Sequence, residues 1–466
     1  MKKDTIAAIS TGMTNSGIGI VRISGDEAFH VIDKIYRGKG QLREAKSHTI
    51  HYGYIRDGEE TIDEVLVMLM RSPRTFTGED TVEINCHGGT YVVKRVLETV
   101  IKNGARPAEP GEFTKRAFLN GKMDLSQAEA VIDVITSKSE YALQSSISQL
   151  KGSVKKKIED IRQQIIYHTA FIETALDDPE HIDIDGYGDE LKGIVEDLLD
   201  EIRQLIDSSD SGRIMKEGIQ TVIVGKPNAG KSSLLNVLAG KDRAIVTDIE
   251  GTTRDILEEQ IRLKGLTLNM VDTAGIRNTD DIIEKIGVDK AKDYIKNSDL
   301  VIYVVDASRP LDSNDREIMT LLEGRKVIVL LNKSDLNTVI TKENLKETFQ
   351  CLSENSGDSL EIPMIEISAK EEQGLSEFEA VLNEMFLHGE VSFNDEVYIT
   401  NIRHKAALSD AYESLGKVVE SIENQMPEDF FSIDLMDAYE SLGSITGETI
   451  GEDLVNEIFS KFCMGK

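Results

Sequence analysis

The chain has 466 residues and a formal net charge of −30 at pH 7, with 40% hydrophobic and 29% charged residues. That length suffices for about three domains, each with its own apolar core. We find neither a run of about 18 apolar residues nor a charged-then-apolar leader, so we expect a cytoplasmic protein with no membrane association. The cysteines are odd in number and lack a CxxC pair, which argues against disulfides and structural zinc.

The negative charge is distributed unevenly. Residues 1–120 carry 17 Lys or Arg against 16 Asp or Glu, whereas the remaining chain carries 36 against 67. A protein that coats nucleic acid needs surplus cations, so the overall charge excludes that class. Any nucleic-acid contact would use local basic faces. The candidates, for which solvated surface charge is an equally good interpretation, are Lys94, Arg95, Lys115, Arg116 and the lysines at 155–157.

The pattern of apolar residues changes along the chain. Residues 1–118 mix short apolar runs with Gly and Pro, which predicts an α+β domain. Helical spacing through 119–215 predicts long packed helices, and it returns in 386–466. Between them, strand-like runs in 216–385 alternate with helix-length segments, which predicts a parallel sheet with helices on both faces. We therefore expect a multidomain fold, with an inserted α/β P-loop GTPase (Ras-like) domain interrupting an all-α domain.

A phosphate-binding motif lies at the start of the predicted α/β domain. Residues 225–232, GKPNAGKS, fit GxxxxGK[ST] between a strand-like run and a helix-like run. The glycines let the loop wrap closely, while its N–H groups and the helix N-terminus attract phosphate oxygens. Lys231 would reach the terminal phosphates and Ser232 would ligate Mg²⁺.

Further motifs follow in the order typical of GTPases. Thr252-Thr253 precede a DTAG run at 272–275, whose aspartate would hold the magnesium shell. Asn332-Lys333-Ser334-Asp335 follows another strand-like run, and its carboxylate can accept hydrogens from guanine N1 and N2, which adenine does not offer. Ser368-Ala369-Lys370 completes the base pocket. These motifs predict a site for GTP rather than ATP.

The position after the DTAG run holds Ile276, where Ras-like switches carry a glutamine that orients the attacking water. A hydrocarbon cannot do this. Hydrolysis therefore needs another water-positioning group and another positive charge, from this chain or from a partner. Downstream candidates, each also compatible with a surface salt bridge, are Arg277, Asp280, Asp281 and Glu284.

Characteristic segments occur along the chain: GIGIVRISG at 17–25, CHGG at 86–89, PGEFTKRAFLN at 110–120, the segments 225–233 and 247–255, and FCMGK at 462–466. Through these segments, essentially the whole chain resembles the MnmE/TrmE family of tRNA modification GTPases. It implies a homodimer with a folate-binding N-terminal domain and a potassium-activated G domain. It also implies a heterotetramer or larger complex with the FAD-containing partner MnmG. Together they would add an aminomethyl or carboxymethylaminomethyl-type group to C5 of the wobble uridine, position 34, of certain tRNAs.

The same resemblance assigns roles to residues of the nucleotide site. It implies that Asn228 ligates K⁺ with the backbone carbonyls of Thr247, Ile249 and Thr252, and that Ser232 and Thr253 ligate Mg²⁺. Glu284 would be the catalytic, water-orienting residue, which answers the gap left by Ile276. Glu250 stands where other members often have a small residue. The residues expected to bind GTP are Asn228, Ala229, Gly230, Lys231, Ser232, Ser233, Thr247, Asp248, Ile249, Glu250, Gly251, Thr252, Thr253, Asp272, Thr273, Ala274, Gly275, Asn332, Lys333, Asp335, Ser368, Ala369 and Lys370.

A second set of residues is implied for 5-formyltetrahydrofolate or 5,10-methylenetetrahydrofolate, the one-carbon source. It comprises Arg22, Glu83, Lys122 and Lys466. Cys463 is compatible with a nucleophilic thiol and with a small packed side chain. Cys86 and His87 are neighbours on a strand end, so they should point to opposite faces and have structural roles.

Two other functions fit parts of the sequence. One is a regulatory GTPase switch for ribosome assembly or signalling without covalent chemistry. The other is a stand-alone folate enzyme with a regulatory G domain. A switch needs no folate pocket, and a stand-alone enzyme needs no flavoprotein, so the N-terminal domain and the partner distinguish these functions.

Overall fold

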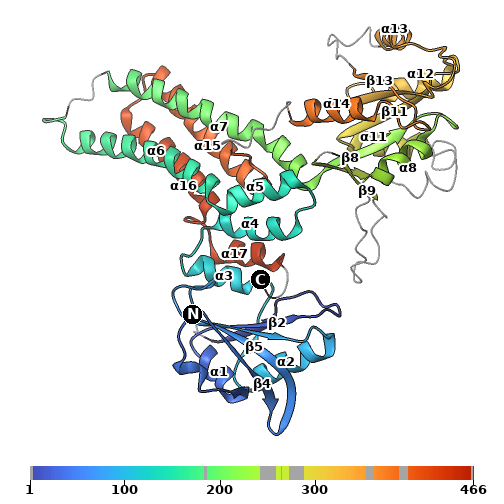
Figure 1. Ribbon diagram of the computed structural model, residues 1–466. Coiled ribbons are helices and arrows are strands. Elements are labelled where there is room, and N and C mark those ends of the chain that lie inside the picture. Colours follow the sequence, from blue (N-terminus) through green and yellow to red (C-terminus); the bar gives the residue numbers. More distant parts are fainter. Residues whose placement is uncertain are drawn as a thin grey trace. The chain divides into compact units, whose positions relative to one another are not determined.

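The computed structural model describes residues 4–182, 186–241, 259–263, 265–271, 288–352, 362–387, 397–462 and 465 (Figure 1). The chain divides into two compact units. The first unit consists of Met1–Thr136, Ser146–Arg203 and Arg403–Lys466, and the second of Ser137–Ser145 and Gln204–Ile402. The second unit thus interrupts the sequence of the first. The three boundaries expected between residues 1–118, 119–215, 216–385 and 386–466 stay a prediction.

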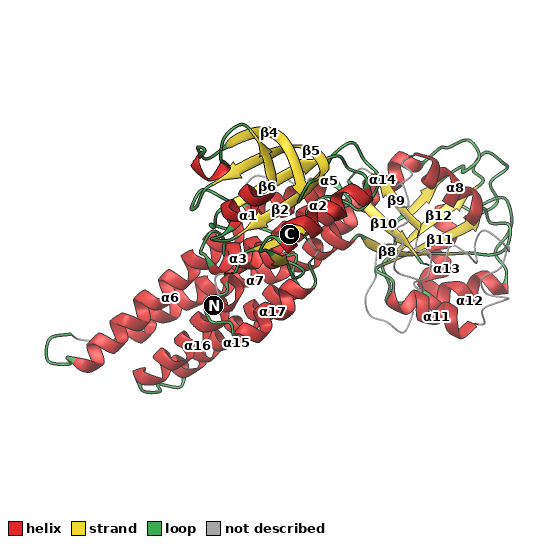
Figure 2. Ribbon diagram, turned by 90° about the horizontal axis from the view of Figure 1, so that it is seen from below, coloured by secondary structure: helices red, strands yellow, loops and turns green. Residues whose placement is uncertain are grey.

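A seven-stranded sheet forms the N-terminal part of the first unit (Figure 2). In spatial order its strands are β3 (Tyr36–Gly38), β4 (Thr49–Asp57), β5 (Glu60–Met70), β6 (Thr81–Cys86), β2 (Gly19–Ser24), β1 (Ile6–Ile9) and β7 (Arg106–Pro107). Neighbouring strands are antiparallel except β1 and β7. The expected α+β domain is confirmed.

The two faces of this sheet differ because side chains alternate along each strand. One face buries Val21, Val67 and Ile84 beneath α1 (Ala28–Ile35) and α2 (Thr90–Lys102). A short helix, η1 (Leu42–Glu44), packs against α1. By register, Arg22 and Glu83 lie on the opposite face.

Helices make up the remainder of the first unit. They include α3 (Glu112–Leu119), α4 (Leu125–Thr136), α6 (Ser153–Asp177), most of α15 (Ile402–Glu423), α16 (Glu428–Thr446) and α17 (Glu452–Ser460), while α5 (Glu140–Leu150) and α7 (Tyr187–Glu217) have residues in both units. α6 packs along α16, α4 contacts α3, α6 and α16, and α3 contacts α17. The helix spacing predicted from the sequence is confirmed by the burial of Val154, Ile158, Ile161 and Ile165 along α6. Within the described chain, no helix has the length and apolarity needed to cross a membrane.

A buried ionic cluster joins α4 to α15 within the first unit. The Glu129 carboxylate accepts from Arg403 Nε at 3.0 Å and lies 2.8 Å from His404 Nε2. Burial raises the pKa of Glu129, but His404 and Arg403 outweigh it and lower the pKa to about 2. The carboxylate is therefore ionised across the physiological range, and its two partners compensate the buried charge.

The second unit is built on a six-stranded sheet. Its spatial order is β13 (Met364–Glu366), β12 (Val327–Asn332), β11 (Leu300–Asp306), β8 (Ile219–Val224), β10 (Leu266–Met270) and β9 (Glu259–Leu263). All pairs are parallel except β9 with β10. The expected α/β domain with a P-loop is therefore confirmed, and the carboxyl ends of the parallel strands lie along one edge, where ligands bind in open α/β folds.

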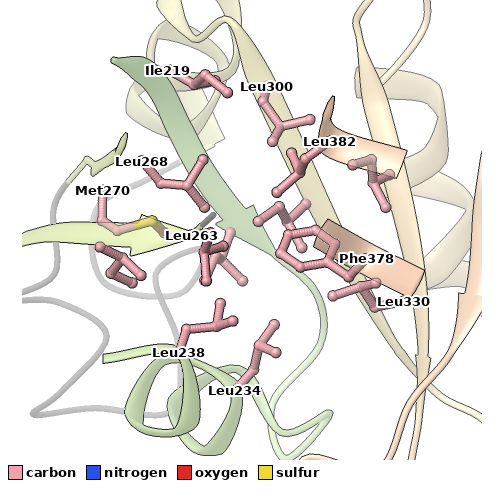
Figure 3. Packing of buried hydrophobic residues seen from close by; sticks show 14 of the residues in the cluster. Ile219, Leu234, Leu238, Leu263, Leu268, Met270, Leu300, Leu330, Phe378 and Leu382 are labelled. Carbon is pink, nitrogen blue, oxygen red and sulfur yellow. The ribbon is translucent and has the colours of Figure 1, made fainter. Parts of the chain in front are cut away.

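Helices cover both faces of this sheet. α8 (Lys231–Lys241) and α14 (Leu375–Leu387) pack on one face, while α11 (Val288–Asn297), α12 (Ser313–Leu321) and α13 (Lys342–Leu352) pack on the other. Figure 3 shows Leu234 and Leu238 of α8 and Phe378 and Leu382 of α14 directed toward the strands. All of β11 is buried, as expected for a parallel strand with both faces covered.

Candidate guanine-nucleotide site

The phosphate-binding motif forms the loop between β8 and α8. β8 ends at Val224 and α8 begins at Lys231. Gly230 has a φ of +101°, and a Cβ there would lie 2.1 Å from Asn332 Nδ2. Only glycine combines that backbone conformation with so close an approach. The loop therefore wraps tightly in front of the N-terminus of α8, where the first-turn amides and the helix dipole favour an anion.

Lys231 lies across the inside of this loop. Its Nζ donates to the carbonyl oxygens of Gly225 at 2.6 Å and Lys226 at 2.8 Å, and the residue is buried. Ser232 and Ser233 follow in the first turn of α8. The loop therefore brings together an ammonium, a hydroxyl and helix amides, which is the donor set that a nucleotide phosphate with Mg²⁺ requires.

Asn332, at the end of β12, connects three loops. Its Nδ2 donates to the Ala229 carbonyl at 2.8 Å, and its Oδ1 accepts from the Ala369 amide at 3.0 Å. The phosphate loop, the Asn-Lys-x-Asp segment and the Ser-Ala-Lys segment are thus held by one buried side chain. Sequence motifs assigned Asn332 to the nucleotide but gave no sign of this structural bridge.

Asp335 lies beside the Ser-Ala-Lys segment. Its Oδ1 accepts from Ser368 Oγ at 2.7 Å. This hydrogen bond holds the pKa of Asp335 below its ordinary value, against the smaller opposing effect of desolvation. The carboxylate is exposed, so its remaining lone pairs can accept the N1 and N2 hydrogens of guanine. Lys370, two residues after Ser368, has a largely exposed side chain.

Lys333 is paired with an aspartate that sequence reasoning missed. Its Nζ lies 2.7 Å from Asp306 Oδ2 at the end of β11. Burial raises the pKa of Asp306, but Lys333 and Ser308 lower it further, so the net shift is downward. Lys333 itself has a φ of +68°. An aspartate ending a buried strand in the sequence Val-Val-Asp could have indicated a role at this edge.

Several predicted site residues lie outside the described part of the chain. They are Thr247, Asp248, Ile249, Glu250, Gly251, Thr252, Thr253, Asp272, Thr273, Ala274, Gly275 and Glu284. In the sequence, β9 and β10, at 259–270, lie between the two groups of these residues, 247–253 and 272–284. Their roles in binding GTP and cations stay predictions.

The predicted folate residues lie in the first unit. Arg22 Nε donates to Glu83 Oε1 at 2.8 Å, and the Arg22 guanidinium carbon lies 5.7 Å from the ring centroid of Phe76 and 5.6 Å from that of Phe113. Lys122 Nζ instead donates to the Pro73 carbonyl at 3.0 Å. The structure thus pairs Arg22 with Glu83 and gives Lys122 a different partner. Lys466 and Cys463 lie outside the described residues.

Other candidates from the sequence are engaged structurally. The Arg116 side chain is 12% exposed and contacts Asp4, Glu79 and Glu112 within 3.2 Å, so it is not presented to a phosphate backbone. Arg95 pairs with Glu60 and Lys157 with Glu201, each at 2.9 Å.

Cys86 is the last residue of β6, and His87 follows the strand. Cys86 is buried, and burial together with Asp63 raises the pKa of its thiol to about 11. His87 is exposed, with Nδ1 2.7 Å from Asp63 Oδ1. Across the described residues no three His, Cys, Asp or Glu side chains are grouped as metal ligands.

A glycine-rich loop before a helix and an Asn-Lys-x-Asp segment at the same sheet edge define a P-loop guanine-nucleotide-binding protein. Residues 5–122 match the family model for the GTP-binding protein TrmE N-terminus, and residues 125–463 match the MnmE helical domain. The chain belongs to the MnmE family of tRNA modification GTPases.

Relatives match over their full length. The tRNA modification GTPase MnmE of Lachnoclostridium phytofermentans is 58% identical over 469 residues, covering 100% of both chains. That of Acetivibrio thermocellus is 50% identical with 100% of both covered, and that of Clostridioides difficile is 47% identical with 99% of both covered. The solved G domain of the T. maritima FeoB iron transporter is 29% identical and covers 36% of this chain and 97% of that one, with a TM-score of 0.23. A score this low supports no structural argument.

Proposed function

We propose that the protein hydrolyses GTP with potassium activation and takes part in modification of tRNA wobble uridine. The observation that carries the nucleotide assignment is the Asn332 bridge. It holds the phosphate loop and the Ser-Ala-Lys segment together, beside the Asp335 carboxylate. Phosphate and guanine contacts are thereby fixed to each other within one unit, which is the geometry that recognition of a whole nucleotide needs.

The proposed cation sites use the same loop. Asn228 has an exposed side chain and a φ of +61°, and its amide oxygen is a suitable ligand for K⁺. Backbone carbonyls of Thr247, Ile249 and Thr252 would complete that site. Ser232 and Thr253 would hold Mg²⁺. When bound, these cations supply positive charge that stabilises the phosphates as the terminal bond breaks.

The chain's own residues perform the other steps of the proposed hydrolysis. Lys231 binds the terminal phosphates, the amides at the start of α8 orient them, and Asp335 selects guanine. We assign Glu284 to orienting the attacking water, since Ile276 has no polar atom to do so.

The proposed one-carbon chemistry belongs to the first unit. The Arg22–Glu83 pair beside two aromatic rings offers donors, an acceptor and apolar surface to a pterin. With Lys122 and Lys466 it would bind 5-formyltetrahydrofolate or 5,10-methylenetetrahydrofolate. The FAD-containing partner MnmG, in a heterotetramer or larger complex, would then take part in adding the aminomethyl-type group to C5 of uridine 34.

We further propose that the protein is a cytoplasmic homodimer. The β4–β5 part of the sheet face opposite α1 and α2 supports a second copy as partner, because Ile50, Tyr52 and Leu66 lie there and are 60%, 56% and 48% exposed. Grouped apolar side chains of this kind mark interaction surfaces. Arg22 and Glu83 share that face, so the dimer contact and the folate site would be adjacent.

The first experiment compares GTP hydrolysis in potassium and sodium buffers of equal ionic strength. We expect strong stimulation by potassium, and its loss in Asn228→Ala. The matched control is Asn236→Ala, an exposed amide on α8 outside the phosphate loop. Equal, slow rates in both salts would contradict potassium activation and favour a regulatory switch that awaits an external activator.

A second experiment tests the folate assignment. We expect Arg22→Ala to lose binding of 5-formyltetrahydrofolate in equilibrium titration, because Glu83 then loses its partner and the pterin a donor. Lys39→Ala, which removes an exposed cation from the same domain, should bind normally. Intact binding in Arg22→Ala would count against the site.

A further inference from the structure

Lys226, the second residue of the phosphate loop, is bound to the helix that follows β11. Its Nζ lies 2.8 Å from Asp312 Oδ2 and 2.6 Å from Asp315 Oδ2. The Lys226 side chain is 20% exposed and that of Asp315 only 2%. This ammonium is therefore largely withdrawn from solvent and held by two carboxylates.

Those carboxylates are themselves fixed by the N-terminus of α12. Asp312 Oδ1 accepts from the amides of Asn314 at 2.9 Å and Asp315 at 3.3 Å, and Asp315 Oδ2 accepts from the Asp312 amide at 2.9 Å. Tyr303 in β11 donates its hydroxyl to Asp315 Oδ1 at 3.1 Å. Because this capping box and a buried strand residue hold both carboxylates, Lys226 is attached to a rigid support.

The backbone of Lys226 belongs to the interior of the loop. Its carbonyl accepts from Lys231 Nζ at 2.8 Å and from the Ala229 amide at 3.3 Å. One residue thus joins α12, through its side chain, to the turn that carries Asn228 and to the ammonium of Lys231, through its carbonyl. Neither the motif nor the family resemblance assigns a role to the Lys226 side chain.

We propose that Lys226 is a positioning residue that fixes the phosphate loop on the N-terminus of α12 and so sets the affinity of the site for nucleotide and monovalent cation. This inference rests on the proposed function for its cation part. Without the anchor, the loop would sample conformations in which Asn228 and the amides at 229–231 are misplaced. Only a fraction of the molecules would then have the phosphate loop in the conformation that binds nucleotide, so the apparent affinity for nucleotide would fall by that fraction.

The charge of Lys226 is consistent with its role as an anchor between the phosphate loop and α12. Desolvation lowers the pKa of Lys226, but the hydrogen bonds and charges of Asp312 and Asp315 outweigh it, so the net shift is upward. Lys226 is therefore a permanent cation near neutral pH. Removing it leaves the buried Asp315 carboxylate uncompensated, so the α12 end would rearrange as well.

The test uses the full-length protein with Lys226→Met, the conservative Lys226→Arg, and Lys346→Met, which removes an exposed cation of α13, as matched control. For Lys226→Met we expect the KM for GTP and the half-saturating potassium concentration to rise by about tenfold each, as for loss of one charge-assisted contact. Turnover at saturating GTP and potassium should change by less than about twofold. Lys226→Arg should restore most of the affinity, and the control should match the parent protein.

A milder variant separates positioning from misfolding. Asp312→Asn keeps a good N-cap residue for α12 and leaves Asp315 in place, yet it removes one charge from Lys226. We expect the same changes in smaller degree, with an unchanged thermal unfolding midpoint. A folded Lys226→Met protein with the parent's KM for GTP and the parent's potassium response would overturn the proposal. A decrease in turnover with unchanged KM would also overturn it, because that result indicates only a smaller fraction of active protein.

Binding of fluorescent GDP in sodium buffer keeps this inference distinct from the proposed function. If the parent protein showed no potassium stimulation, the proposed activation would fail, while weaker GDP binding by Lys226→Met would still support the positioning role. If potassium stimulated the parent protein and Lys226→Met bound GDP and potassium normally, only the positioning role would be refuted.

Discussion

Replacing Asn332 by alanine should disconnect the two halves of the nucleotide site. The substitution leaves the Ala229 carbonyl and the Ala369 amide without the partners that Asn332 provides at 2.8 and 3.0 Å. All three residues are buried, so water cannot readily replace the amide. The effect should therefore appear both in stability and in nucleotide binding.

The size of the stability loss follows from the Ala229 carbonyl and the Ala369 amide, which both lose a hydrogen-bond partner. A buried donor or acceptor that loses its partner costs about 1–3 kcal/mol, so the two together should lower the free energy of unfolding of the second unit by roughly 2–6 kcal/mol. Typical domains are stable by only about 5–15 kcal/mol, so the loss is a large fraction of the total. Guanine affinity should fall as well, because Asp335 and the phosphate loop lose their common support.

Urea unfolding followed by circular dichroism, with and without GDP, measures both effects. We expect a lower midpoint for Asn332→Ala and a smaller stabilisation by GDP than in the parent protein. The control is Asn314→Ala, which removes an exposed amide from the first turn of α12. An unchanged midpoint together with unchanged GDP affinity would refute the bridge.

Three further predictions concern single carboxylates. Glu129→Gln should lower the free energy of unfolding of the first unit by on the order of 3 kcal/mol near neutral pH. This difference from the parent should shrink as pH falls from about 4.5 toward 2, because the pKa of Glu129 is about 2 in the folded protein and its ordinary value is 4.5. Urea midpoints across that pH range measure this, with the exposed Glu173→Gln showing no such trend. Asp335→Asn should weaken GDP binding by at least about tenfold and strengthen xanthosine diphosphate binding, because an amide can donate to the xanthine C2 carbonyl. If competition titrations gave the variant the same preference between the two nucleotides as the parent protein, the guanine assignment would be contradicted. Glu284→Ala should bind GTP normally yet abolish turnover in single-turnover kinetics, and unchanged turnover would remove Glu284 as the water-orienting residue.

Apolar periodicity predicted much of the fold because it records which faces are buried. The seven buried residues of β11 and the helical stripe of α6 follow directly from their patterns. Periodicity does not show what a stripe packs against. Residues 140–150 form the expected helix, yet Tyr141 packs on the turn between β9 and β10 at Gly265. Such contacts depend on how distant segments meet, which local spacing does not encode.

The nucleotide site was predictable to the extent that its chemistry lies in contiguous motifs. Lys231, Asn332 and Asp335 could each be located from a few neighbouring letters. The support for these residues comes from other strand ends and helices, as with Asp306 beside Lys333 and Asp315 beside Lys226. The position of Asp306 at the end of a strand could have indicated this edge of the sheet, but no spacing in the sequence pairs it with Lys333 or pairs Asp315 with Lys226.

The interrupted sequence of the first unit has a consequence for biosynthesis. α4 and α6 contact α16, and α3 contacts α17; both partners follow the second unit in the chain. Ser10 Oγ likewise donates to the Gly465 carbonyl at 3.1 Å. At about 5–20 residues per second, the roughly 250 residues between the end of α6 at Asp177 and the start of α16 at Glu428 delay that partner by on the order of 10–50 seconds. The apolar stripe of α6 therefore leaves the ribosome well before α16, the helix that packs against it. The second unit, by contrast, emerges almost without interruption. Nascent chains that stop before Arg403 should bind holding chaperones through α6, and release should follow synthesis of α16.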